Sequence, residues 1–133
     1  MIASAISLQN ARDPNADNAD FRSALGCFAT GVTIVTCRDG LVPKGIVANS
    51  FASVSLAPPL VLWSPAKASR RYAAFIAAQA FSIHILAQDQ KHLSDAFVHN
   101  ETPFDTLEWY SDARGVPVLS KCLARFDCHL HGQ

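Results

Sequence analysis

The chain has 133 residues, and its eleven basic residues balance eleven acidic ones. A single domain of this length can bury a substantial core, and a neutral balance argues against nucleic acid as the main partner, because phosphate binding needs a basic surface. No apolar run reaches the roughly 18 residues of a membrane span, and the N-terminus lacks the pattern of a secretory signal, so we expect a cytoplasmic protein with no membrane partner.

Four cysteines, Cys27, Cys37, Cys122 and Cys128, show no CxxC spacing and have apolar neighbours. We therefore expect buried free thiols. The tail "CHLH" contains metal-ligand residue types, but Cys128 and His129 are adjacent and would point to opposite faces of a strand. Known zinc sites have different spacings, so we expect no metal site.

The N-terminal part of the chain divides into a polar stretch and a helical pattern. Residues 1–17 contain few bulky apolar groups and are expected to form a flexible arm, which leaves 18–133 as the folded domain. Phe21, Leu25 and Phe28 recur at helical spacing and predict a helix that begins near residue 18.

Three strand patterns follow. Residues 32–37, "VTIVTC", are β-branched and predict a strand. A turn at 38–40 leads into a second strand at 41–49, where Pro43 indicates an edge position or a bulge. Pro58-Pro59 then precedes a short buried strand at 60–63.

The second half alternates helices and strands. We predict a helix at 69–78 with Ser69 as its N-cap, a strand at 80–86, a helix at 88–97, and a loop from 99 to 117. His84 lies on the face of its strand opposite the large apolar residues. A final strand at 123–131 alternates, with four residues inward (Ala124, Phe126, Cys128, Leu130) and four outward (Arg125, Asp127, His129, His131). Hairpin strands interrupted by helices predict an antiparallel α+β fold, a β-barrel with flanking helices.

No motif for a Rossmann site, a P-loop, a serine nucleophile or a zinc protease is present. Two segments remain. The first, "GIVANSFASVS" at 45–55, begins as a strand and then fills with small residues and hydroxyls that could meet the polar rim of a planar heterocycle. The second, "SPAKASRR" at 64–71, suggests an anion site near a helix N-terminus. A ring site and a phosphate site together suggest a mononucleotide, although spacing alone favours an ordinary turn beside a capped helix.

From "FRSALGCFATGVTIVTCRDG" through "KAS", "FSIHILAQDQKHLSDAF" and "GVPVLSKCLARFDCHLH", the chain resembles the flavin reductase family, whose members have an FMN-binding split barrel. The resemblance implies a homodimer that binds FMN or FAD and reduces it with NADH or NADPH for a partner monooxygenase. Hydride transfer between cofactors needs binding and orientation rather than a side-chain nucleophile, so no catalytic side chain is expected.

By position, the resemblance assigns ten residues to the flavin site: Val47, Ala48, Asn49, Ser50, Ser53, Val54, Ser55, Ser64, Lys67 and Ser69. The first four lie by the ring and ribityl chain, the next three along the other edge of the ring, and the last three at the phosphate.

The sequence departs from the family pattern at three points. Val47 stands where a threonine is usual, and His84 stands where an asparagine is common. We expect His84 to be a core histidine bonded to a backbone group, with cofactor contact as the weaker alternative. The family pattern also continues into a Gly-Asp-His segment and closing strands, whereas this sequence ends at Gln133. Without those strands the final strand would have an open edge, so we expect a fragment, or a barrel completed by another segment or subunit.

Two further hypotheses therefore stay open beside a flavin reductase. One is a flavin-binding electron-carrier module of the same fold with little reductase turnover. The other is a truncated, inactive domain.

Overall fold

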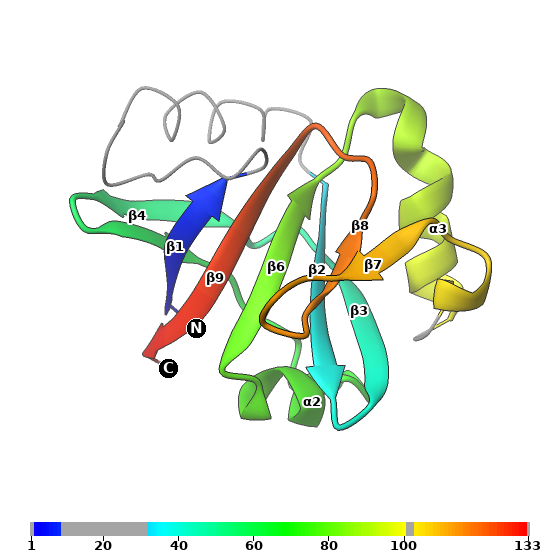
Figure 1. Ribbon diagram of the computed structural model, residues 1–133, viewed down its shortest axis with the longest axis horizontal. Helices are drawn as coiled ribbons and strands as arrows, with labels where there is room; N and C mark the ends of the chain where they lie inside the picture. The colour runs from blue at the N-terminus through cyan, green and yellow to red at the C-terminus, as the bar shows by residue number, and fades with distance from the viewer. Residues whose placement is uncertain (1, 9–31, 101–102, 133) are drawn as a thin grey trace.

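The computed structural model describes residues 2–8, 32–100 and 103–132, and its centre is a seven-stranded antiparallel sheet (Figure 1). The strand order is β3-β2-β6-β9-β1-β5-β4. The strands are β1 (Ile2–Leu8), β2 (Thr33–Asp39), β3 (Val42–Ala48), β4 (Ala52–Leu56), β5 (Pro59–Leu62), β6 (Ala80–Ile85) and β9 (Ala124–Gly132). The predicted antiparallel α+β class is confirmed, but the described strands form an open sheet and no closed barrel, because β3 and β4 end the order without pairing to each other.

The open sheet is nevertheless strongly curled. Only residues 49–51 join β3 to β4, although these strands lie at opposite ends of the strand order. A flat sheet of this size would be about 29 Å wide, whereas the link from Ala48 to Ala52 reaches about 14 Å at most. The two edge strands therefore approach each other at this link, which leaves a seam rather than a closed wall.

The β2–β3 hairpin forms as predicted. Its turn contains Gly40 at φ 61°, a conformation that favours glycine. β3 is an edge strand, which agrees with the position of Pro43.

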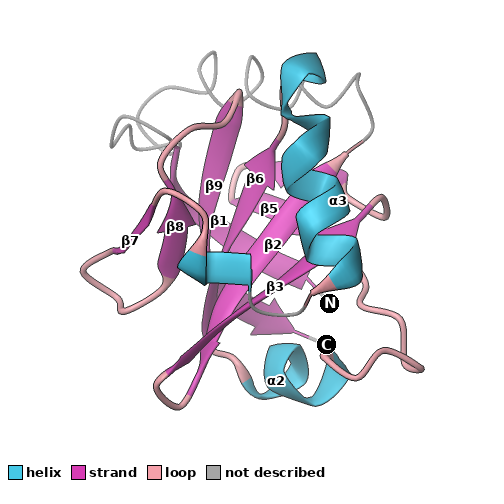
Figure 2. Cartoon of the chain, turned by 90° about the vertical axis from the view of Figure 1, so that its right-hand side faces the viewer, coloured by secondary structure: helices cyan, strands magenta, loops and turns pink. Residues whose placement is uncertain are grey.

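In the described residues, helix α3 lies alongside the sheet next to β3, and helix α2 lies at the end of the sheet near the β2–β3 hairpin (Figure 2). α2 (Tyr72–Ala77) packs Phe75 into a core cluster with Trp63, Phe81 and Phe126. The 3-10 turn η2 (Gln88–Gln90) leads into α3 (Lys91–His99), which packs Phe97 into a second cluster.

The close approach of α3 to β3 depends on a glycine. A Cβ at Gly45 would lie 2.2 Å from Cε1 of Phe97, so any larger residue would displace either the Phe97 ring or the helix that carries it.

Two sequence-based expectations about the sheet are wrong. The expected arm over residues 1–17 includes strand β1, and the final strand does not have an open edge, because β9 lies between β6 and β1. Pairing between β1 and β9 joins segments more than a hundred residues apart. Local periodicity carries no information about such a partner, so the sequence could not reveal it.

The expected loop from 99 to 117 contains further structure. It holds the 3-10 turn η3 (Pro103–Asp105) and β7 (Trp109–Ser111), which pairs with β8 (Pro117–Leu119). Strands of three residues are too short to show a period, which explains why this hairpin was missed.

The helix predictions have mixed outcomes. The helix expected from residue 18 lies outside the described residues. The helix at 69–78 is shorter than expected, and Ser69 is not its N-cap. The helix at 88–97 is confirmed as η2 followed by α3. Among the described residues, no helix is long and apolar enough to cross a membrane.

Candidate functional site

The link across the seam carries a run of exposed small side chains. We name residues 49–55 and 64–69 the polar strip. Asn49, Ser50, Ser53 and Val54 are exposed, and Ser55 is half-buried. These residues lie in the link from β3 to edge strand β4. The small side chains that the sequence places in this segment are therefore the ones exposed at the seam.

Two hydrogen bonds join the halves of the polar strip. The Ser64 N–H donates to Ser50 Oγ at 2.9 Å, and the Ser50 hydroxyl donates to the Ser64 carbonyl at 3.1 Å. A single serine thus fixes the β3–β4 link against the segment that leads to α2. The structure brings together the two segments that the sequence analysis singled out separately.

A bulge shapes the middle of the strip. The β4–β5 register shifts between Ser53 and Ser55, so Val54 is an extra residue whose side chain is 49% exposed. Bulges re-aim side chains beside functional sites. Because β4 is an edge strand, one row of its peptide N–H and C=O groups lies outside the sheet ladder.

The structure places two of the assigned residues away from the strip surface. Val47 packs against the cluster under α3, and Ala48 is buried in the other core cluster. The Ala48 carbonyl accepts a hydrogen bond from Thr33 Oγ1 at 2.6 Å. The side chains of these two residues therefore support the fold beside the strip.

The phosphate-site residues lie in the turn before α2. Lys67 is exposed, whereas Ser69 is half-buried and its Oγ accepts the Arg71 N–H at 3.1 Å. α2 has only six residues and no side-chain N-cap bond. The Lys67 ammonium group is thus the feature of this segment that suits an anion.

His84 is fully buried in β6, as the sequence analysis expected. Its Nε2 accepts the Leu119 N–H at 3.1 Å, so Nδ1 carries the proton and donates to the Ile34 carbonyl at 3.0 Å. Burial lowers the pKa of His84 to about 4. The neutral ring ties β6 to β2 and β8, and this geometry confirms the expected bond to a backbone group.

A second buried polar group was not anticipated. We name Ser82, Asp112, Arg114, Arg125 and Asp127 the charged clasp. Arg114 contacts Asp112 at 2.6 Å, Ser82 at 2.9 Å and Asp127 at 3.4 Å, and Arg125 contacts Asp127 at 2.8 Å. Asp127 was expected to face outward, but it is only 7% exposed because Arg114, from the β7–β8 connection, covers that face of β9.

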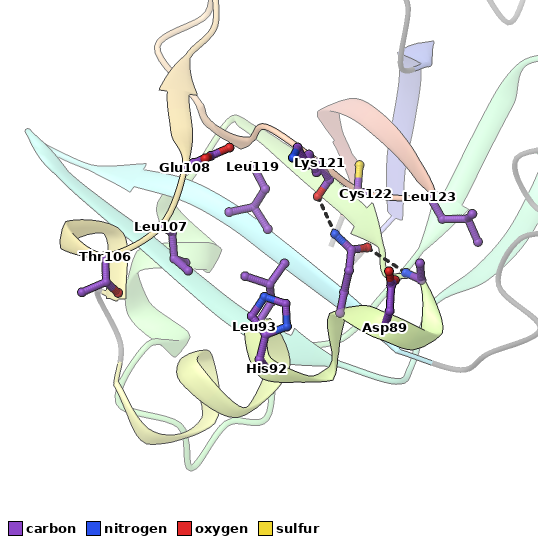
Figure 3. Close-up of a pocket in the computed structure, with 12 residues that line it drawn as sticks. Asp89, His92, Leu93, Thr106, Leu107, Glu108, Leu119, Lys121, Cys122 and Leu123 are labelled. Atoms are coloured by element: carbon purple, nitrogen blue, oxygen red, sulfur yellow. Dashed lines mark hydrogen bonds between the residues drawn. The ribbon is translucent and has the colours of Figure 1, made fainter.

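A cavity with a volume of about 580 Å³ lies elsewhere in the described structure (Figure 3). It is enclosed by the residues around η2 and the start of α3, by those before β7, and by the β8–β9 connection. None of the ten residues assigned to the flavin site lines it. Its charged residues come from three separate segments, so no sequence spacing could have grouped them.

The described cysteines are free thiols, as expected, and Cys37 and Cys128 are buried. Burial raises the pKa of Cys37 to about 12 and that of Cys122 to about 11, and it also raises the pKa of Cys128. These thiols are neutral at pH 7 and unsuited to nucleophilic chemistry. Cys27 lies outside the described residues. The described residues contain no cluster of three or more His, Cys, Asp or Glu side chains that could hold a metal ion.

Residues 25–133 match the family described as the flavin reductase like domain. The chain belongs to this family. It is 53% identical over 116 residues to the FMN reductase (NADH) SmoA of Agrobacterium fabrum, an alignment that covers 86% of this chain and 67% of that protein. It is also 41% identical over 115 residues to HsaB, the reductase subunit of a flavin-dependent monooxygenase from Rhodococcus jostii. That alignment covers 86% of this chain and 59% of HsaB.

Solved structures agree with these relatives. The NADH:FAD oxidoreductase of Streptomyces globisporus, in complex with NAD and FAD fragments, is 35% identical with a TM-score of 0.71, over 90% of this chain and 73% of that one. Nitrilotriacetate monooxygenase component B from Mycobacterium thermoresistibile is 39% identical with a TM-score of 0.72, over 89% and 66% of the two chains. The chain thus spans between 59% and 73% of the length of each of these four proteins.

The polar strip of this flavin reductase like domain has chemistry that fits a flavin. One edge of the flavin ring alternates carbonyl and N–H groups, and the free edge of β4 offers the complementary peptide groups. Ala52 and Ser53 are small and exposed, so a flat ring can approach the backbone there. Asn49 adds a side-chain amide that can both donate and accept.

Proposed function

We propose that this chain is an NAD(P)H-dependent flavin reductase that supplies reduced flavin to a partner monooxygenase. The observation that carries the proposal is the 53% identity to an NADH-dependent FMN reductase along 86% of the chain. Two further relatives, from Rhodococcus jostii and Acinetobacter baylyi, are named as reductase components of flavin-dependent monooxygenases. The free peptide edge and the small side chains of the polar strip support the same function.

The chemistry that a bound FMN or FAD supplies is acceptance of a hydride from a reduced nicotinamide. The chain's own groups bind and orient. Asn49 and the peptide groups of residues 52–55 hold the polar edge of the ring, while Ser50 keeps the strip rigid through its bonds to Ser64. Lys67 neutralises phosphate charge. Orientation of this kind is what a hydride transfer requires of a protein.

We also propose that two copies pair across the seam, which makes each curled sheet a split barrel. The open edge expected on the final strand, which another subunit could have completed, is filled by β1 and gives no support for a dimer. The support now comes from the seam, where edge strand β4 carries unpaired peptide groups and the exposed side chain of Val54. A dimeric mass by light scattering at micromolar concentration is expected, and a monomer would contradict this part.

Anaerobic spectroscopy tests the reductase. The purified protein is titrated with FMN and with FAD, and NADH or NADPH is then added while the flavin absorbance is followed. Reduction faster than in a protein-free control is the expected result. Flavin binding without accelerated reduction would instead indicate an electron-carrier module, and absence of flavin binding would reject both functions.

A further inference from the structure

The cavity in Figure 3 is not used by the polar strip, yet it has the size of a small-molecule site. Its volume of about 580 Å³ lies within the range of roughly 300–1,000 Å³ that is typical of ligand pockets. It lies between η2 and the first turn of α3 on one side and the approach to β7 on the other, and the β8–β9 connection forms a third wall.

Apolar side chains form part of the cavity wall. Leu93, Leu107 and Leu119 line it and belong to or pack against the core cluster under α3. The backbone of Leu119 is fixed by a hydrogen bond, because its N–H donates to His84 Nε2. A rigid apolar surface of this kind suits a flat aromatic ring.

Charged groups occupy the rim. Glu108 and Lys121 lie at the same end of the cavity in Figure 3, and neither side chain has a hydrogen bond or ion pair to the part of the chain that the structure describes. Asp89 and His92 lie on the opposite wall. The Glu108 carboxylate and the Lys121 ammonium group thus have no partner among the described residues, lie beside an apolar surface, and are available to a ligand.

The rim is fixed by one glutamine. Gln90 Oε1 accepts the Ala87 N–H at 2.8 Å, and Gln90 Nε2 donates to the Lys121 carbonyl at 2.9 Å (Figure 3). The start of the helical segment is thereby tied to the β8–β9 connection. The cavity walls are therefore held together by bonds that a ligand need not supply.

We propose that this cavity binds the adenosine 5′-phosphate part of a dinucleotide, an inference that rests on the proposed function. The leucines take the adenine ring, the Glu108 carboxylate accepts the ribose hydroxyls, and the Lys121 ammonium group pairs with the phosphate. A carboxylate at the ribose repels a 2′-phosphate, so the site favours NADH over NADPH. NADH and FAD both carry this group, whereas FMN does not.

The position of the cavity is compatible with a dinucleotide that reaches the polar strip. Four neighbouring strands, β3, β2, β6 and β9, each contribute one residue to a row of register partners: Ala48, Thr33, Ile85 and Ala124. Ala48 thus lies about 14 Å, or three strand spacings, from Ala124. The cavity begins at the next residue, Leu123, at the same end of the sheet. A ligand with two nucleoside halves can therefore occupy the cavity with one half and the strip with the other.

Calorimetric titration with 5′-AMP and adenosine 2′,5′-bisphosphate tests the inference. The unmodified protein should bind 5′-AMP about tenfold more tightly than the bisphosphate. Glu108→Gln should lower the affinity for 5′-AMP by about tenfold, because one charged hydrogen bond is lost. Glu108→Lys should reverse the preference. Asp95→Asn removes an exposed carboxylate of α3 that does not line the cavity; it is the matched control and should leave both affinities unchanged.

Competition then identifies the source of the adenosine. Displacement of 5′-AMP by NADH but not by FAD assigns the cavity to the reductant, and the opposite result assigns it to FAD. Absence of 5′-AMP binding, or unchanged affinity in Glu108→Gln, would overturn the inference. FMN binding and its reduction by NADH are measured separately on the same variants, so a protein that reduces FMN without binding 5′-AMP retains the proposed function and loses only this site.

Discussion

The polar strip and the charged clasp are both rich in polar residues, but they use them in opposite ways. In the clasp, Arg114 and Asp127 are each bonded to several partners, and their side chains are 16% and 10% exposed. In the strip, Ser50 is bonded to Ser64 and Ser69 accepts the Arg71 N–H, but most of the other polar side chains, including those of Asn49, Ser53 and Lys67, are exposed. A polar residue with satisfied partners thus maintains the fold, whereas an exposed polar residue at the seam is available to a ligand.

The largest effect is expected in the clasp. Arg114→Ala removes bonds to Ser82, Asp112 and the Cys128 carbonyl and leaves Asp127 largely buried with one cation fewer. Breaking a buried ion-pair network by removing one partner costs about 3–5 kcal/mol of unfolding free energy. Urea denaturation measures this loss. If the variant keeps its stability, the clasp does not hold the β7–β8 connection.

His84 should make stability depend on pH. Its pKa is about 4 in the folded chain and 6.5 in a model peptide. The unfolded chain therefore takes up the proton first as pH falls, so the stability that the neutral ring provides is complete above pH 6.5 and is lost between pH 6.5 and 4. The loss amounts to about 3 kcal/mol. Denaturation at pH 7 and pH 4.5 should show a smaller difference for His84→Asn, and an equal difference would remove His84 as the cause.

In the strip, substitution should affect binding and leave stability nearly unchanged. Asn49→Leu removes a polar group at the proposed ring site and should weaken flavin binding by about 1–3 kcal/mol. The free energy of unfolding should stay within about 0.5 kcal/mol of that of the unmodified protein. Fluorescence titration measures the first and urea denaturation the second. Gln79→Leu, an exposed amide outside the strip, is the control. Unchanged flavin affinity in Asn49→Leu would remove this residue from the site.

The smallest effect is expected at Lys67, which is exposed and screened by solvent. Lys67→Ala should lower the affinity for FMN by only about threefold to tenfold, because one exposed ion pair contributes little binding free energy. Riboflavin, which has no phosphate, should bind equally to both forms. Lys91→Ala, another exposed lysine outside the strip, serves as the control. Equal losses for both ligands would show that Lys67 does not contact phosphate.

The elements that depend on local patterns could be predicted from the amino-acid sequence. The β2–β3 hairpin, strand β6 with its buried histidine, helix α3 and the inward residues of β9 follow from periodicity and turn chemistry. The small side chains within 49–55 also indicated the segment that is exposed at the seam. These signals are readable because each depends on neighbours within one element.

The contacts between distant segments became visible only in the folded chain. The fold placed β1 beside β9, covered the outward face of β9 with the clasp, and gathered Asp89, Glu108 and Lys121 around one cavity. It also moved the side chains of Val47 and Ala48 into the core, because alternate residues of a curled sheet face opposite sides and both sides are packed at that point. Pairing, covering and curvature are set by contacts between residues far apart in the chain, and the free energy of those contacts has no counterpart in any local sequence pattern.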